Sequence, residues 1–380
     1  MATFETSLKS RLIYVFAIPD EWHKDCLKVG ETTLEEDDGN FPLPNSEVLN
    51  KAACDRIDQY TKTTGIAYNL LHTEMTVFFK GGTISSFNDK QVHSVLERSG
   101  VKKKTFDTVK GANEWFCCDL ETVKKAIHAV KNGRNSLNAS DISYTQTPII
   151  FRPEQQAAID KTKKQFKKGS QMLWNAKMRF GKTLCALCVA RDLEMRRTII
   201  LTHRPVVDES WFEDFGKICY DRTDYHYGSR TKGEDFASLE RLAKKGDRYV
   251  YFASMQDMRG AQLVGGKFDK NNEVFSTDWD FLIVDEAHEG TRTELGESVI
   301  KELTKANTKV LKLSGTPFNL LDDYTEEETY TWDYTMEQRA KTEWDLLHMG
   351  DPNPYASLPA INIYTYDLGA LMNDYSEDEK

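Results

Sequence analysis

The chain of 380 residues is poor in several features that mark other classes of protein. It has no apolar run near the roughly 20 residues that a membrane-spanning helix needs. Its first residues, MATFETSLKSRLIYVFAIPDEW, include acids and lysine early and so lack the apolar centre of a secretory signal peptide. The seven cysteines are few and odd in number, which favours reduced thiols. We therefore expect a soluble cytoplasmic protein without a membrane partner.

The cysteine spacing also lacks a metal-binding pattern. Cys185 and Cys188 form one CxxC on an expected helix, and no second CxxC lies nearby. Adjacent residues of a strand point to opposite faces, so Cys117 and Cys118 are poorly placed to share a tetrahedral metal. We interpret Cys185 and Cys188 as core residues and expect no cysteine metal site.

The chain is short of positive charge only at its end. The net charge is −10, yet residues 1–150 hold 18 basic and 20 acidic side chains, and residues 151–320 hold 29 and 25. Residues 321–380 hold 3 basic and 15 acidic side chains. A nucleic-acid partner needs a local basic groove rather than a basic total, so the sequence pI of about 5.4 does not exclude one.

The distribution of polar residues predicts two domains. The stretch SLNASDISYTQTP has few apolar residues and indicates a linker over 136–149. Before it, over 1–135, short β-rich runs and helical spacings alternate irregularly, which predicts a small α+β domain. The expected elements are a hairpin at 11–18 and 26–32, a strand at 69–79, and helices at 46–63, 89–101 and 120–133.

After the linker, strand, turn and helix patterns alternate regularly over 150–320. The strand-like runs are rich in β-branched residues and nearly continuous, as in parallel strands that are covered on both faces. They lie at 171–176, 197–203, 248–255, 280–288 and 309–317. This pattern predicts a doubly wound α/β domain with its site at the strand ends.

Two of these strand ends carry residues that suit a nucleotide triphosphate. AKMRFGKT, from Ala176 to Thr183, follows a strand and opens a helix, where backbone N–H groups can surround phosphates. Lys182 would contact the β and γ phosphates, and the Thr183 hydroxyl would bind Mg²⁺. FLIVDEAH brings Asp285, as a Mg²⁺ ligand, and Glu286, as a group that orients water, to another strand end.

Together with FRPEQQAAID, TIILTHRP, YFASMQ and LSGTP, these motifs resemble helicase superfamily 2 of the DEAD/DEAH class. The resemblance covers about 150–320 and implies a RecA-like P-loop domain that uses ATP and Mg²⁺ to act on DNA or RNA. It implies nucleotide-site roles for Arg152, Gln155, Ala176, Lys177, Met178, Arg179, Phe180, Gly181, Lys182, Thr183, Asp285, Glu286, His288, Ser314 and Thr316. Arg179 replaces a glycine of the family, in a position whose backbone conformation is often costly for other residues. We expect ATP binding to survive this replacement.

The sequence lacks a counterpart of the family's second RecA-like domain. Residues 321–380 are an acidic extension with only Arg339, Lys341 and Lys380 as basic residues, and they show no arginine cluster. Motors of this superfamily bind ATP between two such domains. We therefore expect a second domain in a longer chain or on a partner subunit, and weak ATP hydrolysis by these residues alone.

The first domain resembles the GIY-YIG nuclease family, in the branch whose second motif reads KIG or KVG. LIYVFAI carries Tyr14, LKVGETT carries Lys28, and the following helices carry Arg56 and Glu97; NEWF at 113–116 resembles a closing element. The resemblance implies a divalent metal on Glu97, with Arg56 offsetting developing charge and Tyr14 or Lys28 helping to generate the attacking water. This chain departs from the family in reading LIY rather than GIY and in the long insertion before Arg56.

The leading hypothesis is an ATP-dependent DNA helicase or translocase coupled to a metal-dependent endonuclease, acting on double-stranded DNA in restriction-like defence or repair. Tyr14 as a core aromatic and Glu97 as an exposed helix carboxylate remain alternatives for the single residues. Two alternative functions follow: a helicase with a non-cleaving DNA-binding module, or an RNA-remodelling helicase. His72 and His93 could assist cleavage, and His203 and Arg204 could contact a nucleic-acid backbone.

Overall fold

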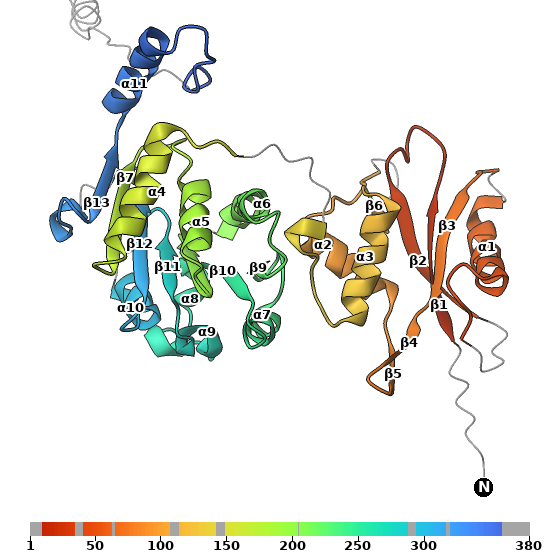
Figure 1. Ribbon diagram of the computed structural model, residues 1–380. Helices are drawn as coiled ribbons and strands as arrows, with labels where there is room; N and C mark the ends of the chain where they lie inside the picture. Colours follow the sequence, from red (N-terminus) through yellow and green to blue (C-terminus); the bar gives the residue numbers. More distant parts are fainter. Residues whose placement is uncertain are drawn as a thin grey trace, which may run out of the picture.

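The computed structural model describes residues 10–34, 41–62, 65–106, 114–141, 149–203, 205–287, 294–316 and 320–358. They form two units that lie side by side (Figure 1). We call residues 10–141 the N-terminal unit and residues 149–358 the C-terminal unit. Among the described residues, no helix is long and apolar enough to span a membrane.

The N-terminal unit is built on a four-stranded antiparallel sheet in the order β3-β1-β2-β6. The predicted hairpin is confirmed, with Tyr14 paired to Gly30. The expected strand at 69–79 divides, because the second half turns away and pairs with another strand. The strands are β1 (Arg11–Ala17), β2 (Leu27–Thr33), β3 (Asn69–Met75), β6 (Trp115–Phe116), and the separate pair β4 (Val77–Lys80) and β5 (Thr83–Ser86).

Helices cover both faces of this sheet. The alternation of β1 sends Ile13 and Val15 toward α2 (Asp89–Arg98) and α3 (Leu120–Lys131). The intervening Leu12, Tyr14 and Phe16 pack on the other face with α1 (Glu47–Thr61). Because directly paired residues share a face, Lys28 and Gly30 of β2 lie on the α1 face with Tyr14.

The C-terminal unit confirms the predicted α/β fold with a RecA-like parallel sheet. Seven strands are paired in parallel in the order β13-β7-β12-β11-β8-β10-β9. The strands are β7 (Gln171–Ala176), β8 (Arg197–Thr202), β9 (Tyr225–Gly228), β10 (Arg248–Ser254), β11 (Phe281–Val284), β12 (Lys309–Ser314) and β13 (Thr329–Trp332). Sequence patterns missed β9 and β13, which are four-residue edge strands.

Two apolar cores separate this sheet from its helices. One core lies under α4 (Pro153–Gln165), α5 (Lys182–Asp192) and α6 (Asp208–Ile218). The other lies under α7 (Phe236–Ala243), α8 (Met255–Met258), α9 (Asn272–Ser276) and α10 (Glu294–Leu303). After β13 the chain continues into α11 (Tyr334–Leu347), which stands above the sheet edge (Figure 1).

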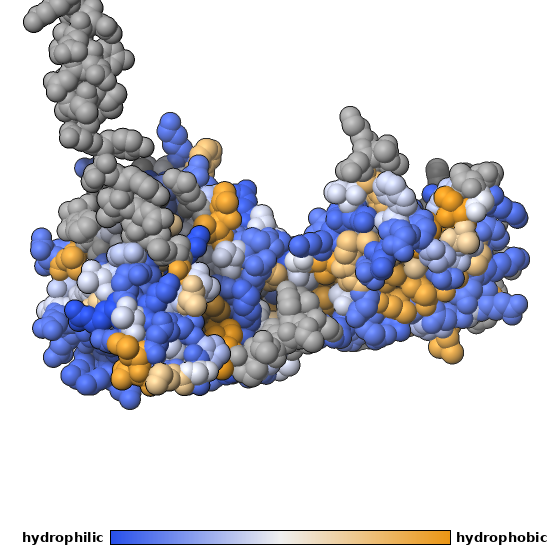
Figure 2. Space-filling view, turned by 90° about the horizontal axis from the view of Figure 1, so that it is seen from above, coloured by the Kyte–Doolittle hydropathy of each residue, from blue (hydrophilic) through white to orange (hydrophobic). Residues whose placement is uncertain are grey.

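The two units are joined by polar contacts. The Arg98 guanidinium, at the end of α2, donates to the carbonyls of Ser229, Arg230, Lys232 and Gly233 at 2.7–3.4 Å. The buried Glu234 carboxylate accepts from the Arg134 side chain and from the N–H groups of residues 135 and 136. The narrow junction between the units carries hydrophilic residues in the space-filling view (Figure 2). We call residues 229–233 with Arg98 the joint.

Two candidate functional sites

The first candidate site is the loop between β7 and α5. Ala176 is the last residue of β7, and α5 begins at Lys182 directly after Gly181, whose φ is 92°. The N–H groups at the start of α5 are therefore aimed out of the loop, as in phosphate-binding loops. Thr183 lies in the first turn of α5, and Met178 is 76% exposed at the outer side of the loop.

Two residues of this site hold a left-handed backbone without being glycine. Arg179 has φ of 64°, and Glu286 has φ of 48°. Such a conformation costs an L-residue roughly 1–2 kcal/mol. A glycine would adopt this left-handed conformation without that cost. The backbone at Arg179 is therefore strained, as predicted from the replacement of the family's glycine. Non-glycine residues with this strain cluster at functional sites.

Lys182 and the two acids after β11 face each other. The Lys182 ammonium donates to the Ala176 carbonyl at 2.8 Å, and burial lowers its pKa while the charges of Glu286 and Asp285 oppose the shift. Burial raises the pKa of Asp285, the Glu286 charge raises it further, and Lys182 acts in the opposite direction. A bound phosphate or metal would relieve both desolvated groups.

The end of β12 closes this site. A Cβ added to Gly315 would lie 3.9 Å from the Lys182 ammonium and 3.8 Å from the Ala176 carbonyl, so this turn sits against the loop. Ser314 is buried, and its hydroxyl accepts from the Thr316 N–H at 3.2 Å. His288, the last residue of the predicted DEAH motif, lies outside the described residues.

Arg152 and Gln155 support the loop from the start of α4. Both donate to the Phe180 carbonyl, Gln155 Nε2 at 2.7 Å and Arg152 Nη2 at 3.0 Å. The Phe180 ring is buried against Trp174. Arg152 also pairs with Glu154, whose other oxygen accepts from the Tyr355 hydroxyl at 2.7 Å. These two predicted nucleotide-site residues are therefore linked to the chain that follows β13.

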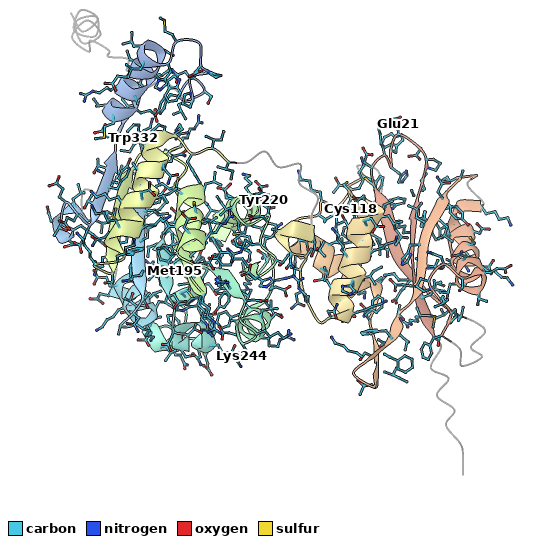
Figure 3. All side chains as sticks on the ribbon, viewed as in Figure 1. Glu21, Cys118, Met195, Tyr220, Lys244 and Trp332 are labelled. Atoms are coloured by element: carbon cyan, nitrogen blue, oxygen red, sulfur yellow. The ribbon has the colours of Figure 1, made fainter. Side chains whose placement is uncertain are left out.

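Lys177 makes a contact that no sequence pattern predicts. Its ammonium lies 2.5 Å from a carboxylate oxygen of Glu337 on α11, and Glu337 is fully buried. The other oxygen of Glu337 has no hydrogen-bond partner among the described residues. The Lys177 N–H also donates to the carbonyl of Trp332, which Figure 3 marks where β13 ends and α11 approaches. No local pattern could have paired residues 160 positions apart.

The second candidate site lies between β1, β2 and α1. The structure brings Tyr14, Lys28 and Arg56 together on one face of the sheet: the Arg56 charge and hydrogen bond act on Tyr14, and Lys28 lies beside Phe16. Tyr14 is buried, which raises the pKa of its hydroxyl. A Cβ on Gly30 would lie 2.7 Å from the Tyr14 oxygen, so the second motif needs glycine here.

Two further residues belong to this group. Tyr60, one turn after Arg56 on α1, lies next to Tyr14, and its ring centre is 4.5 Å from the Lys28 ammonium. Glu114 pairs with Lys28 at 3.4 Å, and its charge also acts on Tyr14. The NEWF pattern singled out residues 113–116, but it did not predict that Glu114 belongs to the site. A helical projection from Arg56 could have found Tyr60, since residues four apart share a helix face.

Glu97 lies on α2, which covers the opposite face of the sheet. It lines a pocket of about 340 Å³ with His93, Lys103 and Glu114, among others, and pairs with Lys103 at 2.5 Å. Glu114 therefore connects this pocket to the Tyr14 group. The His93 ring is hydrogen-bonded to the Val29 carbonyl, with 2.8 Å between Nε2 and the oxygen. His72 pairs with Glu74, and both lie on the face of the sheet that α2 and α3 cover.

The residues of both sites suit a magnesium ion that is bound in part by water and phosphate. Among the residues that the structure describes, no group of three or more His, Cys, Asp or Glu side chains could hold a metal by itself. Mg²⁺ usually takes one or two carboxylates, several waters and substrate phosphate oxygens. In the C-terminal unit, Thr183 and Asp285 could bind such an ion. In the N-terminal unit, Glu97 could supply the single carboxylate.

The C-terminal unit matches a known family. Residues 148–319 match the family model described as "Type III restriction enzyme, res subunit". This match covers less than half of the chain and supports a helicase-like domain in the C-terminal unit.

A relative and two solved structures show partial overlap. A Mycoplasma pneumoniae protein named as the C-terminal part of a putative type II restriction enzyme and methyltransferase is 26% identical over 272 residues, 60% of this chain. This chain spans 37% of the length of that relative. The SWI2/SNF2 ATPase core of Sulfolobus solfataricus with dsDNA has a TM-score of 0.35 and 16% identity, over 49% of this chain and 37% of that one. The UvsW helicase of bacteriophage T4 has a TM-score of 0.35 and 14% identity, over 67% and 99%.

Proposed function

Because residues 148–319 form a helicase-like domain, we propose that this chain is the ATP-dependent part of a DNA translocase or helicase, coupled to a GIY-YIG-type endonuclease in the N-terminal unit. Restriction-like defence is the proposed setting, in line with the name of the Mycoplasma relative; DNA repair is the other setting that suits the pairing. The observation that carries the proposal is that Lys182, at the start of α5, faces Asp285 and Glu286, which follow β11.

In this proposal each residue of the C-terminal site has one task in ATP hydrolysis. Lys182 leaves the Ala176 carbonyl and binds the β and γ phosphates. Thr183 and Asp285 hold Mg²⁺, which neutralises phosphate charge when bound. Glu286 orients the attacking water toward the γ phosphate. Motors of this superfamily bind ATP between two RecA-like domains, so residues of a second such domain would complete the site.

In the N-terminal unit the proposed reaction is hydrolysis of a DNA phosphodiester. Water attacks phosphorus and loses a proton to the deprotonated form of Tyr14 or of Lys28. The bond from phosphorus to the leaving oxygen breaks, and that oxygen takes a proton from solvent. Arg56 offsets the charge that develops on the phosphate. Glu97 would hold the metal, which polarises the phosphate when bound. Lys103 must then release Glu97.

One observation favours a second candidate function, a DNA-binding module that does not cut. Two of the three carboxylates that line the pocket already have a lysine partner, Glu97 with Lys103 and Glu114 with Lys28. If those pairs persist on DNA, the pocket presents lysines to the backbone and holds no metal.

Plasmid nicking with Mg²⁺, with and without ATP, separates the two candidates. Glu97→Gln is compared with Glu121→Gln, an exposed glutamate that pairs with Lys124 on α3. We expect nicking by the wild type and Glu121→Gln, and a loss of about 10²-fold in Glu97→Gln, as for a removed charge-stabilising group. Equal nicking by both variants would overturn the role of Glu97, whereas DNA binding without nicking by the wild type would support the non-cleaving module. ATPase stimulation by duplex DNA rather than RNA tests the substrate of the motor.

A further inference from the structure

Two cysteines of the N-terminal unit that have no task in either candidate site lie side by side. The Cys26 and Cys117 thiols are hydrogen-bonded, with 3.1 Å between their Sγ atoms, although 91 positions separate them in the chain. Both are free cysteines. An S–S bond is about 2.0 Å long, so a small approach of the two sulfur atoms would bring them to bonding distance.

The strand register gives this pair the backbone geometry of a cross-strand disulfide. The antiparallel pairing of β2 with β6 places Leu27 opposite Phe116. The next pair in that register is Cys26 opposite Cys117. The N–H groups of both cysteines donate to carbonyls outside this strand pair, at 3.0 and 2.8 Å, so the two residues form a non-hydrogen-bonded pair. Cα atoms of such pairs are about 4.5 Å apart, within the range of about 4.4–6.8 Å that disulfides bridge.

The sheet separates this pair from the neighbouring thiol of Cys118. Cys26 belongs to the core on the α1 face, and its register partner Cys117 shares that face. Cys118 is one residue further along and packs against the core under α2 and α3, on the opposite face. Cys118 is therefore a matched control, because it is adjacent in sequence but directed away from Cys26.

Core packing accounts for Cys26 but not for Cys117. Cys26 is 3% exposed, whereas Cys117 is exposed to solvent. Burial raises the pKa of the Cys26 thiol, so Cys26 is a poor nucleophile toward a dissolved oxidant. The exposed Cys117 is therefore the sulfur that such an oxidant reaches first.

We propose that Cys26 and Cys117 are a reversible disulfide site, which a low-molecular-weight disulfide such as oxidised glutathione closes. Cys117 loses its proton, and its sulfur attacks the small disulfide, which releases one small thiol and leaves a mixed disulfide. The Cys26 sulfur then loses its proton, attacks the Cys117 sulfur and releases the second small thiol. Two protein thiols are oxidised, one small disulfide is reduced to two thiols, and the two cysteine protons pass to the released thiolates.

The disulfide would act on the candidate nuclease site through β6. This strand has two residues, and Glu114, directly before it, pairs with Lys28 of β2. A covalent bond at the other end of so short a strand limits its movement away from β2. We expect the bond to hold Glu114 against Lys28, so that the oxidised chain nicks DNA more slowly than the reduced chain. This effect rests on the proposed endonuclease function, whereas formation of the disulfide does not.

The first test uses the full chain and does not require cleavage. Wild type, Cys117→Ser and Cys118→Ser are incubated with oxidised glutathione, the remaining thiols are alkylated, and the peptides are mapped by mass spectrometry. We expect a link between Cys26 and Cys117 in the wild type and in Cys118→Ser, lost on addition of dithiothreitol. We expect no link in Cys117→Ser. A lasting mixed disulfide on Cys117, or a link that includes Cys118, would overturn the proposed site.

The second test compares plasmid nicking by the oxidised and the reduced chain. Oxidation should slow nicking by the wild type about fivefold, the factor that corresponds to about 1 kcal/mol for a strengthened ion pair, and leave Cys117→Ser unchanged. A linked chain that nicks as fast as the reduced chain would overturn the effect on the nuclease site. A wild type that forms the link but does not nick in either state would overturn the proposed nuclease while supporting the disulfide site.

Discussion

The two candidate sites of this chain are assembled by different kinds of sheet. In the C-terminal unit, all strands are parallel, so the segments after β7, β11 and β12 meet at one edge. In the N-terminal unit the sheet is antiparallel and has helices on both faces, so Tyr14 lies on the α1 face and Glu97 on the α2 side. In the C-terminal unit the order of the motifs is thus enough to bring the site residues together. In the N-terminal unit their positions depend on how the helices pack on the sheet.

The sites also differ in how their charges are matched. Burial lowers the pKa of Lys182 and raises that of Asp285, as expected where a charged ligand is still to come. In the N-terminal unit, Glu97 and Glu114 each already have a lysine partner. The comparison predicts that the C-terminal site is ready to bind ATP. The N-terminal site must first break the pairs of Glu97 and Glu114 with lysines before these carboxylates can bind a metal.

The largest expected effect comes from breaking the contact between the nucleotide loop and α11. Lys177→Met leaves the carboxylate of Glu337 buried and unpaired, which should lower the free energy of unfolding by about 3–5 kcal/mol. Urea denaturation measures this change. The double variant Lys177→Met/Glu337→Leu removes both charges and should recover most of the loss; no recovery would show that the pair is not the cause.

The next effect tests the C-terminal site alone. Lys182→Ala should lower DNA-stimulated ATP hydrolysis by about 10²–10³-fold, since it removes the charge that stabilises the phosphates. A coupled ATPase assay measures this. Lys163→Ala is the control, because that lysine pairs with Asp192 on α5 away from the loop. If nicking is also lost in Lys182→Ala, the motor gates the nuclease, and the two sites are not independent.

A smaller effect should separate the two units. Arg98→Ala removes the guanidinium that donates to carbonyls of residues 229, 230, 232 and 233, and should weaken the joint by about 2–3 kcal/mol. We expect faster hydrogen exchange in 98–100 and 229–233. Arg222→Ala, which breaks ion pairs to Glu194 and Asp224 inside one unit, should leave those segments protected. Equal exchange in both variants would argue against Arg98 as the joint.

The smallest effect concerns the strained loop. Arg179→Gly should stabilise the chain by about 1 kcal/mol, because glycine adopts φ of 64° without the cost of a Cβ. Thermal denaturation without nucleotide measures this. Destabilisation instead would mean that the exposed arginine side chain contributes more than its backbone costs. The ATP KM of the same variant shows whether the guanidinium also contacts phosphate.

Much of the fold could be predicted from local patterns. The continuous apolar runs at 171–176 and 309–317 correspond to β7 and β12, and the RIDQY and VLERSG segments lie on or at the ends of α1 and α2. Short edge strands escaped prediction, because four residues such as TYTW carry too little periodicity to be distinguished from a loop. The assignment of a nuclease to the N-terminal unit stays a prediction.

What the sequence by itself determined is the order of the motifs and the parallel α/β fold that brings Lys182, Asp285 and Glu286 to one edge. The fold follows from hydrophobic periodicity, which is a local property of the sequence. Parallel strands then place their carboxyl ends at the same edge of the sheet. Only the tertiary structure decided that Tyr60 meets Tyr14, that Glu337 pairs with Lys177, and that Arg98 holds residues 229–233. Those contacts depend on how helices pack across long separations in the chain, and no periodicity encodes that packing.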